Sequence, residues 1–185
     1  MKAKKKDIRA LSREEIRDFF QNTGDKAFRG NQVYEWLWSK GAHHFDDMTN
    51  ISKETRELLS EHFVINHIEV DSIQKSKDGT IKNAVKLFDG LIVESVLIPT
   101  PSRTTACVST QVGCSLDCKF CATARLKKMR NLNPDEIYDQ VKAIDQESKL
   151  YHSRPLSNIV FMGMGEPLMN YNNVLKSIDK ITSEE

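Results

Sequence analysis

The sequence lacks a long hydrophobic run and a large net charge of either sign, and no secretory signal is recognised in it. No apolar run approaches the ~20 residues that a membrane-spanning helix needs, so the sequence predicts no membrane association. A formal net charge of +1 gives no overall signature of nucleic-acid binding. Without a secretory signal, a disulfide framework is not expected. The remaining composition, 39% hydrophobic and 29% charged over 185 residues, is typical of a soluble cytoplasmic protein.

Cysteine is scarce, but three of the four cysteines stand close together. Cys114, Cys118 and Cys121 form a C-x-x-x-C-x-x-C spacing. A structural zinc site closes with four protein ligands, and an iron–sulfur cube normally takes four thiolates. Three thiolates can hold a cube and leave one iron open to bind a small molecule. The triplet therefore points to chemistry rather than to a structural metal.

Zinc is the alternative metal, with Cys107 as the fourth ligand. Structural zinc sites usually come as two C-x-x-C-like pairs, whereas Cys107 stands alone before the triplet. An extended segment would carry Cys107 roughly 20 Å or more from Cys114 unless the chain folds back. A disulfide is disfavoured as well, because Cys118 and Cys121 are too close for a comfortable bridge. The spacing favours an iron–sulfur cluster over zinc.

A second motif, Gly163–Leu168, reads Gly-Met-Gly-Glu-Pro-Leu and directly follows an apolar run at 159–162. An apolar run followed by glycines and a carboxylate predicts a strand that ends in a loop, where the backbone can approach a ligand closely. Alone, this motif is weak, because a tight strand-to-helix turn has the same composition. Together with the cysteine triplet it indicates a cofactor site.

The two motifs together resemble those of radical S-adenosylmethionine (SAM) enzymes. More closely, the chain resembles the ribosomal RNA adenine-C2 methyltransferases, whose sibling branch methylates adenine C8. The chain departs from the family pattern at Ala124, where many members have glycine. The residues that carry the resemblance are Val93–Pro99, Cys107–Cys114, Cys118, Cys121–Thr123, Arg130–Leu132, Glu136, Ile137, Gln140, Gly163–Leu168 and Asn170.

The resemblance implies two cofactors and their ligands. Cys114, Cys118 and Cys121 match the family cysteines that hold a 4Fe-4S cluster, whose open iron chelates S-adenosyl-L-methionine. Gly165 and Glu166 match the positions that contact SAM, with the carboxylate facing its ammonium group. In this family the cofactors carry the radical chemistry, and the protein positions them.

The resemblance also implies two catalytic residues. Carbon C2 of adenine is a poor nucleophile, so a radical route through a methylated cysteine replaces direct displacement on SAM. Glu94 matches the family's acceptor of the C2 proton. Cys107 matches the cysteine that resolves the covalent protein–RNA adduct by forming a disulfide. From pattern alone, Glu94 is a carboxylate within a strand-like run and Cys107 is a small buried strand residue.

The pattern along the chain predicts an α/β protein, α+β overall, in three parts. We expect an N-terminal helical accessory domain at 1–66, a β-rich connecting segment at 67–102 and an incomplete radical SAM domain at 103–185. The last part would hold the first βα units of a partial β/α barrel. Ligands on such folds sit at the C-terminal ends of strands, where both motifs fall.

Local signals place the elements within these parts. Ser12 opens a capping box, a second helix is expected to follow Gly30, and a third begins near Ser52. Two hairpins are expected between 68 and 99, with turns at Gly79 and Gly90. A strand at 106–110 leads into the cysteines, a helix opens at 133–136, a strand covers 157–162 and a helix covers 172–182.

The resemblance implies partners that the residues alone do not reveal. We expect 23S ribosomal RNA and transfer RNA as substrates, an electron donor such as flavodoxin, no membrane and a monomer. Cations beside the cysteines are candidates for contacts to RNA phosphate, namely Arg125, Lys127, Lys128 and Arg130.

Two βα units do not close a barrel, and the family's methyl-carrying cysteine has no match here. We therefore expect the sequence to be the N-terminal portion of an enzyme and to be inactive alone. Two other functions stay open. One is adenine-C8 methylation by the antibiotic-resistance branch, and the other is a non-catalytic zinc-stabilised RNA-binding module.

Overall fold

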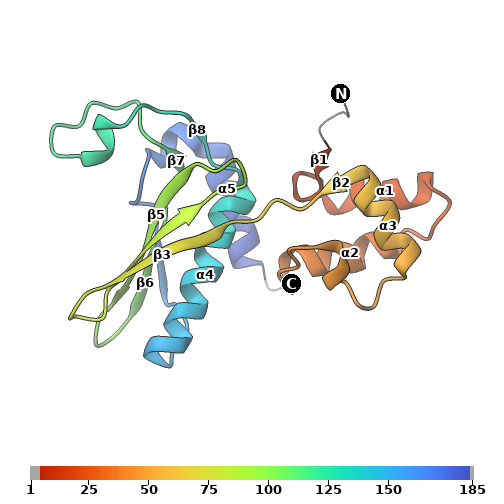
Figure 1. Cartoon of the computed structure of the whole chain (residues 1–185), viewed down its shortest axis with the longest axis horizontal. Helices are drawn as coiled ribbons and strands as arrows, with labels where there is room; N and C mark the ends of the chain where they lie inside the picture. Colours follow the sequence, from red (N-terminus) through yellow and green to blue (C-terminus); the bar gives the residue numbers. More distant parts are fainter. Residues whose placement is uncertain (1–4, 184–185) are drawn as a thin grey trace. The chain divides into compact units, whose positions relative to one another are not determined.

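The computed structural model describes residues 5–183, which divide into two compact units at Asn66 (Figure 1). The first unit ends at Asn66, and the second spans His67–Ser183. Among the described residues, no helix is both long and apolar enough to cross a membrane. Each unit has its own hydrophobic core.

The first unit is built from three helices and a small parallel pair of strands, β1 and β2. The Ser12 hydroxyl accepts from the Glu15 N–H and the Glu15 carboxylate accepts from the Ser12 N–H, which confirms the predicted capping box. The Ser52 hydroxyl likewise caps the third helix through the Thr55 N–H at 3.3 Å. The elements of this unit are β1 (Lys6–Asp7), α1 (Arg13–Asn22), α2 (Phe28–Trp38), α3 (Lys53–His62) and β2 (Phe63–Val64).

Gly30 lies inside the second helix and does not precede it as predicted. Helix α2 begins at Phe28, and a Cβ atom at Gly30 would stand 2.7 Å from the Arg17 Cα atom of α1. The glycine is therefore needed because two helix backbones approach closely here. The prediction that the helix begins after Gly30 was wrong.

The second unit is a five-stranded sheet with two helices. Strands β3, β4, β5 and β6 form an antiparallel meander, and β9 adds to β6 in parallel, in the order β3-β4-β5-β6-β9. The expected hairpin turns are present, with Gly79 and Gly90 at positive φ. The elements are β3 (Glu69–Lys75), β4 (Ile81–Lys86), β5 (Ile92–Pro99), β6 (Thr104–Cys107), β7 (Gln111–Val112), β8 (Arg130–Asn131), α4 (Pro134–His152), β9 (Asn158–Val160) and α5 (Tyr171–Thr182).

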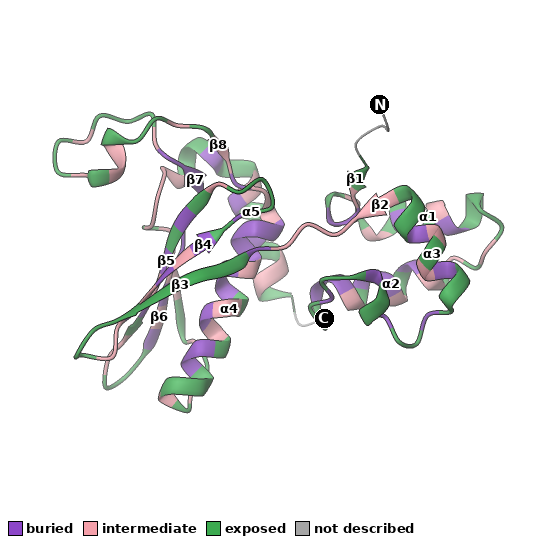
Figure 2. Ribbon diagram, in the orientation of Figure 1, coloured by how far each residue is buried: buried purple, intermediate pink, exposed green. Residues whose placement is uncertain are grey.

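Helices α4 and α5 cover one face of the sheet and leave the other face open (Figures 1 and 2). Along β5 the residues alternate, so that Val93, Ser95 and Leu97 are buried whereas Glu94 is exposed. The buried face packs on α4 through Ile137 and neighbouring apolar side chains. The open face is therefore where polar or reactive side chains of the sheet remain accessible.

The arrangement confirms the predicted α/β class with the start of a β/α barrel. Strands β6 and β9 are parallel neighbours connected through α4, which is the repeating unit of such barrels. The sequence pattern predicts 67–102 and 103–185 as two separate parts. In the described residues the two segments share one sheet, because β5 pairs directly with β6. Strand β6 ends at Cys107, earlier than expected, and the following residues turn away to form β7.

A buried carboxylate, Glu147 of α4, faces the polar side chain of Asn83 in this core. Asn83 Nδ2 donates to Glu147 Oε2 at 2.8 Å, while burial raises the pKa of Glu147 against the opposing effects of Asn83 and Lys75. A raised folded-state pKa contributes stability at low pH that is lost as pH rises through it. Glutamine cannot ionise, so we expect Glu147→Gln to increase the free energy of unfolding at about pH 8 and to flatten its decline as pH rises from the unfolded-state pKa of glutamate to about pH 8. Urea unfolding across that range checks this, and an unchanged pH profile would contradict it.

Candidate active site

The three clustered cysteines lie on the segment 113–129 between β7 and β8, which we call the cysteine loop. Strands β7 and β8 close the base of this loop. These short strands pair antiparallel, with Gln111 opposite Asn131 and Val112 opposite Arg130. Gly113 has a positive φ of 72°, and a Cβ atom there would lie 2.3 Å from the Lys127 carbonyl oxygen. Only glycine therefore lets the two ends of the loop meet so closely.

Cys114, Cys118 and Cys121 all lie on this loop as free thiols. Among residues 5–183, no three His, Cys, Asp or Glu side chains gather closely enough to hold a metal ion. The Ala124 N–H, aided by Thr123, lowers the pKa of the Cys121 thiol and favours the thiolate that a metal requires. Three thiols on one closed loop fit the ligand chemistry of an iron–sulfur cluster, although the structure does not bring the sulfurs together.

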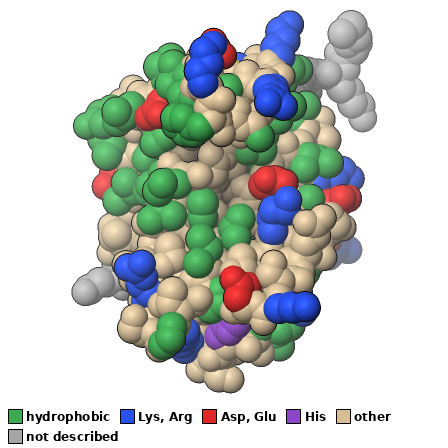
Figure 3. Space-filling view, turned by 90° about the vertical axis from the view of Figure 1, so that its left-hand side faces the viewer, with side chains coloured by type: hydrophobic (Ala, Val, Ile, Leu, Met, Phe, Trp, Pro, Cys, Tyr) green, Lys and Arg blue, Asp and Glu red, His purple; other side chains and the backbone are tan. Residues whose placement is uncertain are grey.

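The rest of the loop exposes apolar and cationic side chains. Phe120, between two of the cysteines, is 94% exposed. Hydrophobic side chains also gather on the face of the molecule shown in Figure 3, with lysines and arginines among them. Exposed apolar groups on this loop and in or next to the second motif are Leu116, Phe120, Leu126, Met129, Met162, Leu168 and Met169. Exposed apolar side chains that gather on one face are typical of a site that receives a ligand or another chain segment.

The second motif forms a turn after β9 that lies against the segment between β6 and β7. The Gly163 N–H donates to the Val108 carbonyl at 3.1 Å, and the Thr110 N–H donates to the Met164 carbonyl at 2.9 Å. Gly165 has a φ of 92°, as glycine allows. The turn is therefore hydrogen-bonded to the chain that leads into the cysteine loop.

Glu166 ends this turn and caps the 3₁₀ helix Pro167–Asn170. Its Oε1 accepts from the Leu168 N–H at 3.1 Å, and its backbone carbonyl accepts from the Met169 N–H at 3.0 Å. The carboxylate is partly exposed, with acceptor capacity to spare. Glu166 can therefore bind a cationic group that approaches the turn.

Glu94 and Cys107 lie on the open face of the sheet, on neighbouring strands. Val96, two residues after Glu94, pairs with Cys107, so all three side chains point to the same face. Glu94 Oε1 accepts from Lys82 Nζ at 3.0 Å in an exposed ion pair. Burial raises the pKa of the Cys107 thiol, so it is held as the neutral thiol. Cys107 is on the sheet and not on the cysteine loop.

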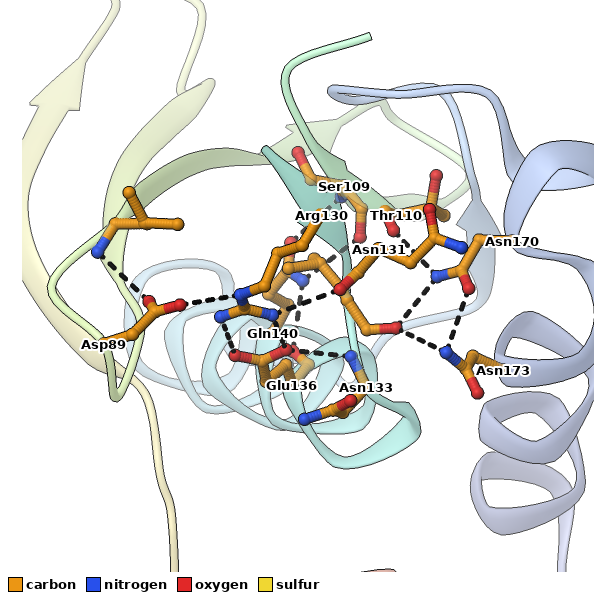
Figure 4. A network of polar contacts seen from close by, with 12 residues as sticks. Asp89, Ser109, Thr110, Arg130, Asn131, Asn133, Glu136, Gln140, Asn170 and Asn173 are labelled. Atoms are coloured by element: carbon orange, nitrogen blue, oxygen red, sulfur yellow. Dashed lines mark hydrogen bonds and ion pairs between the residues drawn. The ribbon is translucent and has the colours of Figure 1, made fainter. Parts of the chain in front are cut away.

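A partly buried polar network joins the base of the cysteine loop to α4 (Figure 4). Arg130 forms two hydrogen bonds with the Glu136 carboxylate, at 2.7 and 2.8 Å, and a third with Asp89 at 2.6 Å. Burial alone would lower the pKa of Arg130, but the hydrogen bonds of Glu136 and Asp89 outweigh it and raise that pKa. Arg130 was one of the candidates for a contact to RNA phosphate, whereas in the structure its guanidinium binds internally to the nearly buried Glu136 carboxylate.

Two side-chain amides extend this network to the second motif. Gln140 of α4 accepts from the Ser109 N–H at 2.9 Å and donates to the Ser109 carbonyl at 3.2 Å. Asn170 donates to the Thr110 and Leu132 carbonyls at 2.8 and 2.9 Å. Gln140 and Asn170 belong to the residues that carry the family resemblance, but the sequence pattern predicts no role for either. A polar residue on the apolar face of α4, as at Gln140, was the signal that could have identified one of them.

Two family models match the chain along separate segments. The ribosomal RNA large subunit methyltransferase N-terminal domain matches residues 6–65. The radical SAM superfamily matches residues 108–183, which include the cysteine loop and the second motif.

Curated relatives match the chain along its whole length. Two are named probable dual-specificity RNA methyltransferase RlmN. The one from Flavobacterium johnsoniae is 75% identical and the one from Flavobacterium psychrophilum is 77% identical, in each case over 100% of this chain and 53% of the relative. A crystal structure of a radical SAM methyltransferase from Sphaerobacter thermophilus is 33% identical, with a TM-score of 0.82 over 97% of this chain and 52% of that one. The chain thus spans about half the length of the relatives it matches.

Proposed function

The chain belongs to the RlmN family of radical SAM methyltransferases, and on this premise we propose that it serves the methylation of RNA. The proposed reaction places a methyl group on C2 of an adenosine in 23S ribosomal RNA and in transfer RNA. The observation that carries the proposal is the hydrogen-bonded junction of the two motifs, because the cysteine loop and the Gly163–Glu166 turn are held together at the ends of neighbouring strands.

In this proposal Cys114, Cys118 and Cys121 hold a 4Fe-4S cluster with one iron open to SAM. When bound, the cluster supplies the electron that cleaves the sulfonium of SAM. The protein supplies thiolates on one loop, and the hydrogen bonds to Cys121 favour its ionised form. The exposed apolar side chains of the loop would exclude water once covered.

Gly165 and Glu166 bind SAM in the same proposal. The glycine brings the backbone close to the ligand, because a side chain is absent on that side. The Glu166 carboxylate accepts hydrogen bonds from the SAM ammonium, which are stronger than bonds between neutral groups. The capping bond to the Leu168 N–H orients the carboxylate before the ligand arrives.

Glu94 and Cys107 act on the substrate side. Their shared position on the open sheet face supports a common substrate, because one adenine ring can face two neighbouring strands. Glu94 accepts the proton that leaves C2. Cys107, held as a neutral thiol by burial, would lose its proton and attack the sulfur of the methyl-carrying cysteine in the covalent adduct. The disulfide would form as the bond from that sulfur to the methylene carbon breaks, and the carbon would keep the electron pair and take a proton to become the methyl group.

The proposal is tested by anaerobic reconstitution of the chain with iron and sulfide, followed by low-temperature electron paramagnetic resonance. We expect a reduced cubane signal that shifts when SAM is added, because the open iron changes its ligands. Stoichiometric zinc without such a signal would replace the proposal with the binding-module function. A cluster whose signal ignores SAM would contradict the SAM site assigned to this chain.

A further inference from the structure

We propose that Ser109 and Gln111 are positioning residues that clamp the Gly163–Glu166 turn onto the base of the cysteine loop. This inference rests on the proposed function, because it concerns the placement of Glu166 relative to SAM. Neither residue is a candidate to touch the reacting atoms. Their side chains act through the backbone of the turn.

The clamp consists of two side-chain acceptors at alternate positions. Ser109 Oγ accepts from the Met164 N–H at 2.8 Å, and Gln111 Oε1 accepts from the Glu166 N–H at 3.0 Å. Between them, the Thr110 N–H donates to the Met164 carbonyl. The turn is therefore held by side chains at both ends and by backbone in the middle.

The glycines of the turn complement these two side chains. A Cβ atom at Gly163 would lie 2.7 Å from Ser109 Oγ, and one at Gly165 would lie 2.5 Å from Gln111 Cβ. Real Cβ atoms do not approach other heavy atoms so closely, so each glycine leaves the space that one clamp residue occupies. The spacing of serine and glutamine in one motif thus matches the spacing of the glycines in the other.

The clamp also reaches the cysteine loop and the candidate base. Gln111 Nε2 donates to Asn131 Oδ1 at 2.7 Å across the β7–β8 pair that closes the loop. Ser109 Oγ donates to the Glu94 carbonyl at 2.5 Å. The three parts of the proposed site are the cysteine loop, the Gly163–Glu166 turn and strand β5 with Glu94. The side chains of Ser109 and Gln111 therefore connect all three.

Burial makes this arrangement stiff. Ser109 and Gln111 are fully buried, and the polar atoms of the Gln111 amide are both used. A buried N–H left without its acceptor is destabilising, so the turn keeps its place as long as the acceptors are present. Removal of the Gln111 acceptor should free the backbone N–H of Glu166 and make the position of the Glu166 carboxylate less fixed.

The test compares Gln111→Met with the unmodified chain after iron and sulfide reconstitution, using SAM as the probe. We expect unchanged iron content, because no thiol is altered. The SAM concentration for half of the spectral shift should rise about tenfold, and amide hydrogen exchange at Glu166 should accelerate about tenfold. Ser109→Ala should accelerate exchange at Met164 and gives a milder second variant if Gln111→Met does not fold.

Asn83→Ala is the matched control, because Asn83 is also fully buried and hydrogen-bonded but lies in β4, outside the clamp. It should lower the unfolding midpoint without changing the SAM response. An equal SAM response in Gln111→Met and the unmodified chain would overturn the clamp alone. A loss of response in Asn83→Ala as well would make the effect one of stability and would also overturn it. If the unmodified chain itself ignores SAM, the proposed function and the clamp both fail.

Discussion

Replacement of Cys118 by alanine is expected to reduce bound iron from about four per chain to almost none. With one of three thiolates lost, two remain, and a cube with two open irons is held too weakly to survive desalting. Iron and sulfide analysis after anaerobic reconstitution measures the loss directly, without need of RNA or of turnover.

Cys107→Ala is the matched control for this experiment, because it removes a thiol of the same chain from the sheet face. Cys107 ends β6 and pairs with Val160 of β9, whereas the three loop cysteines follow β7. We expect it to keep the iron and the SAM response, because none of the three loop cysteines is altered. Equal iron loss in the two variants would make Cys107 a ligand and would restore the four-cysteine zinc alternative.

The parts of the site that sequence could predict are those whose chemistry is local. The spacing of Cys114, Cys118 and Cys121 predicts a ligand set because one loop supplies all of its members, and the ligand set stays a prediction. The capping box at Ser12 and the turns at Gly79 and Gly90 were predicted and are confirmed, since each depends on a few neighbouring residues.

The parts that sequence could not predict depend on long-range pairing. Gln111 contacts the second motif only because β9 joins β6 in parallel, which places residues more than fifty positions apart in contact. Glycine was ambiguous for the same reason. Gly90 marks a turn, whereas Gly30 marks the close approach of a distant helix, and composition does not separate the two. The roles of the individual site residues stay predictions.

A second large effect is expected from Arg130→Met, which should lower the free energy of unfolding by about 3–5 kcal/mol. Arg130 is 24% exposed, but its main partner, Glu136, is only 2% exposed. Loss of the guanidinium leaves a buried carboxylate that keeps the hydrogen bond from the Asn133 N–H, at 2.8 Å, but loses both hydrogen bonds from Arg130. Urea unfolding followed by circular dichroism measures the change, and hydrogen exchange at β8 should show that the base of the cysteine loop opens first.

Arg130→Lys is the conservative control, because lysine keeps the charge but lacks the planar fork that binds Glu136 through two bonds. Its loss of stability should be intermediate.

Acid titration of the free energy of unfolding separates the effect of the Arg130 charge from the effect of its packing. The Arg130 hydrogen bond lowers the pKa of Asp89, so this stabilisation is present above the unfolded-state pKa of Asp89 and is lost as pH falls through the folded-state value. Arg130→Met should therefore lose part of the acid sensitivity of the unmodified chain, whereas Arg130→Lys should keep most of it. Equal unfolding midpoints for Arg130→Met and the unmodified chain at neutral pH would show that the network does not hold the loop in place.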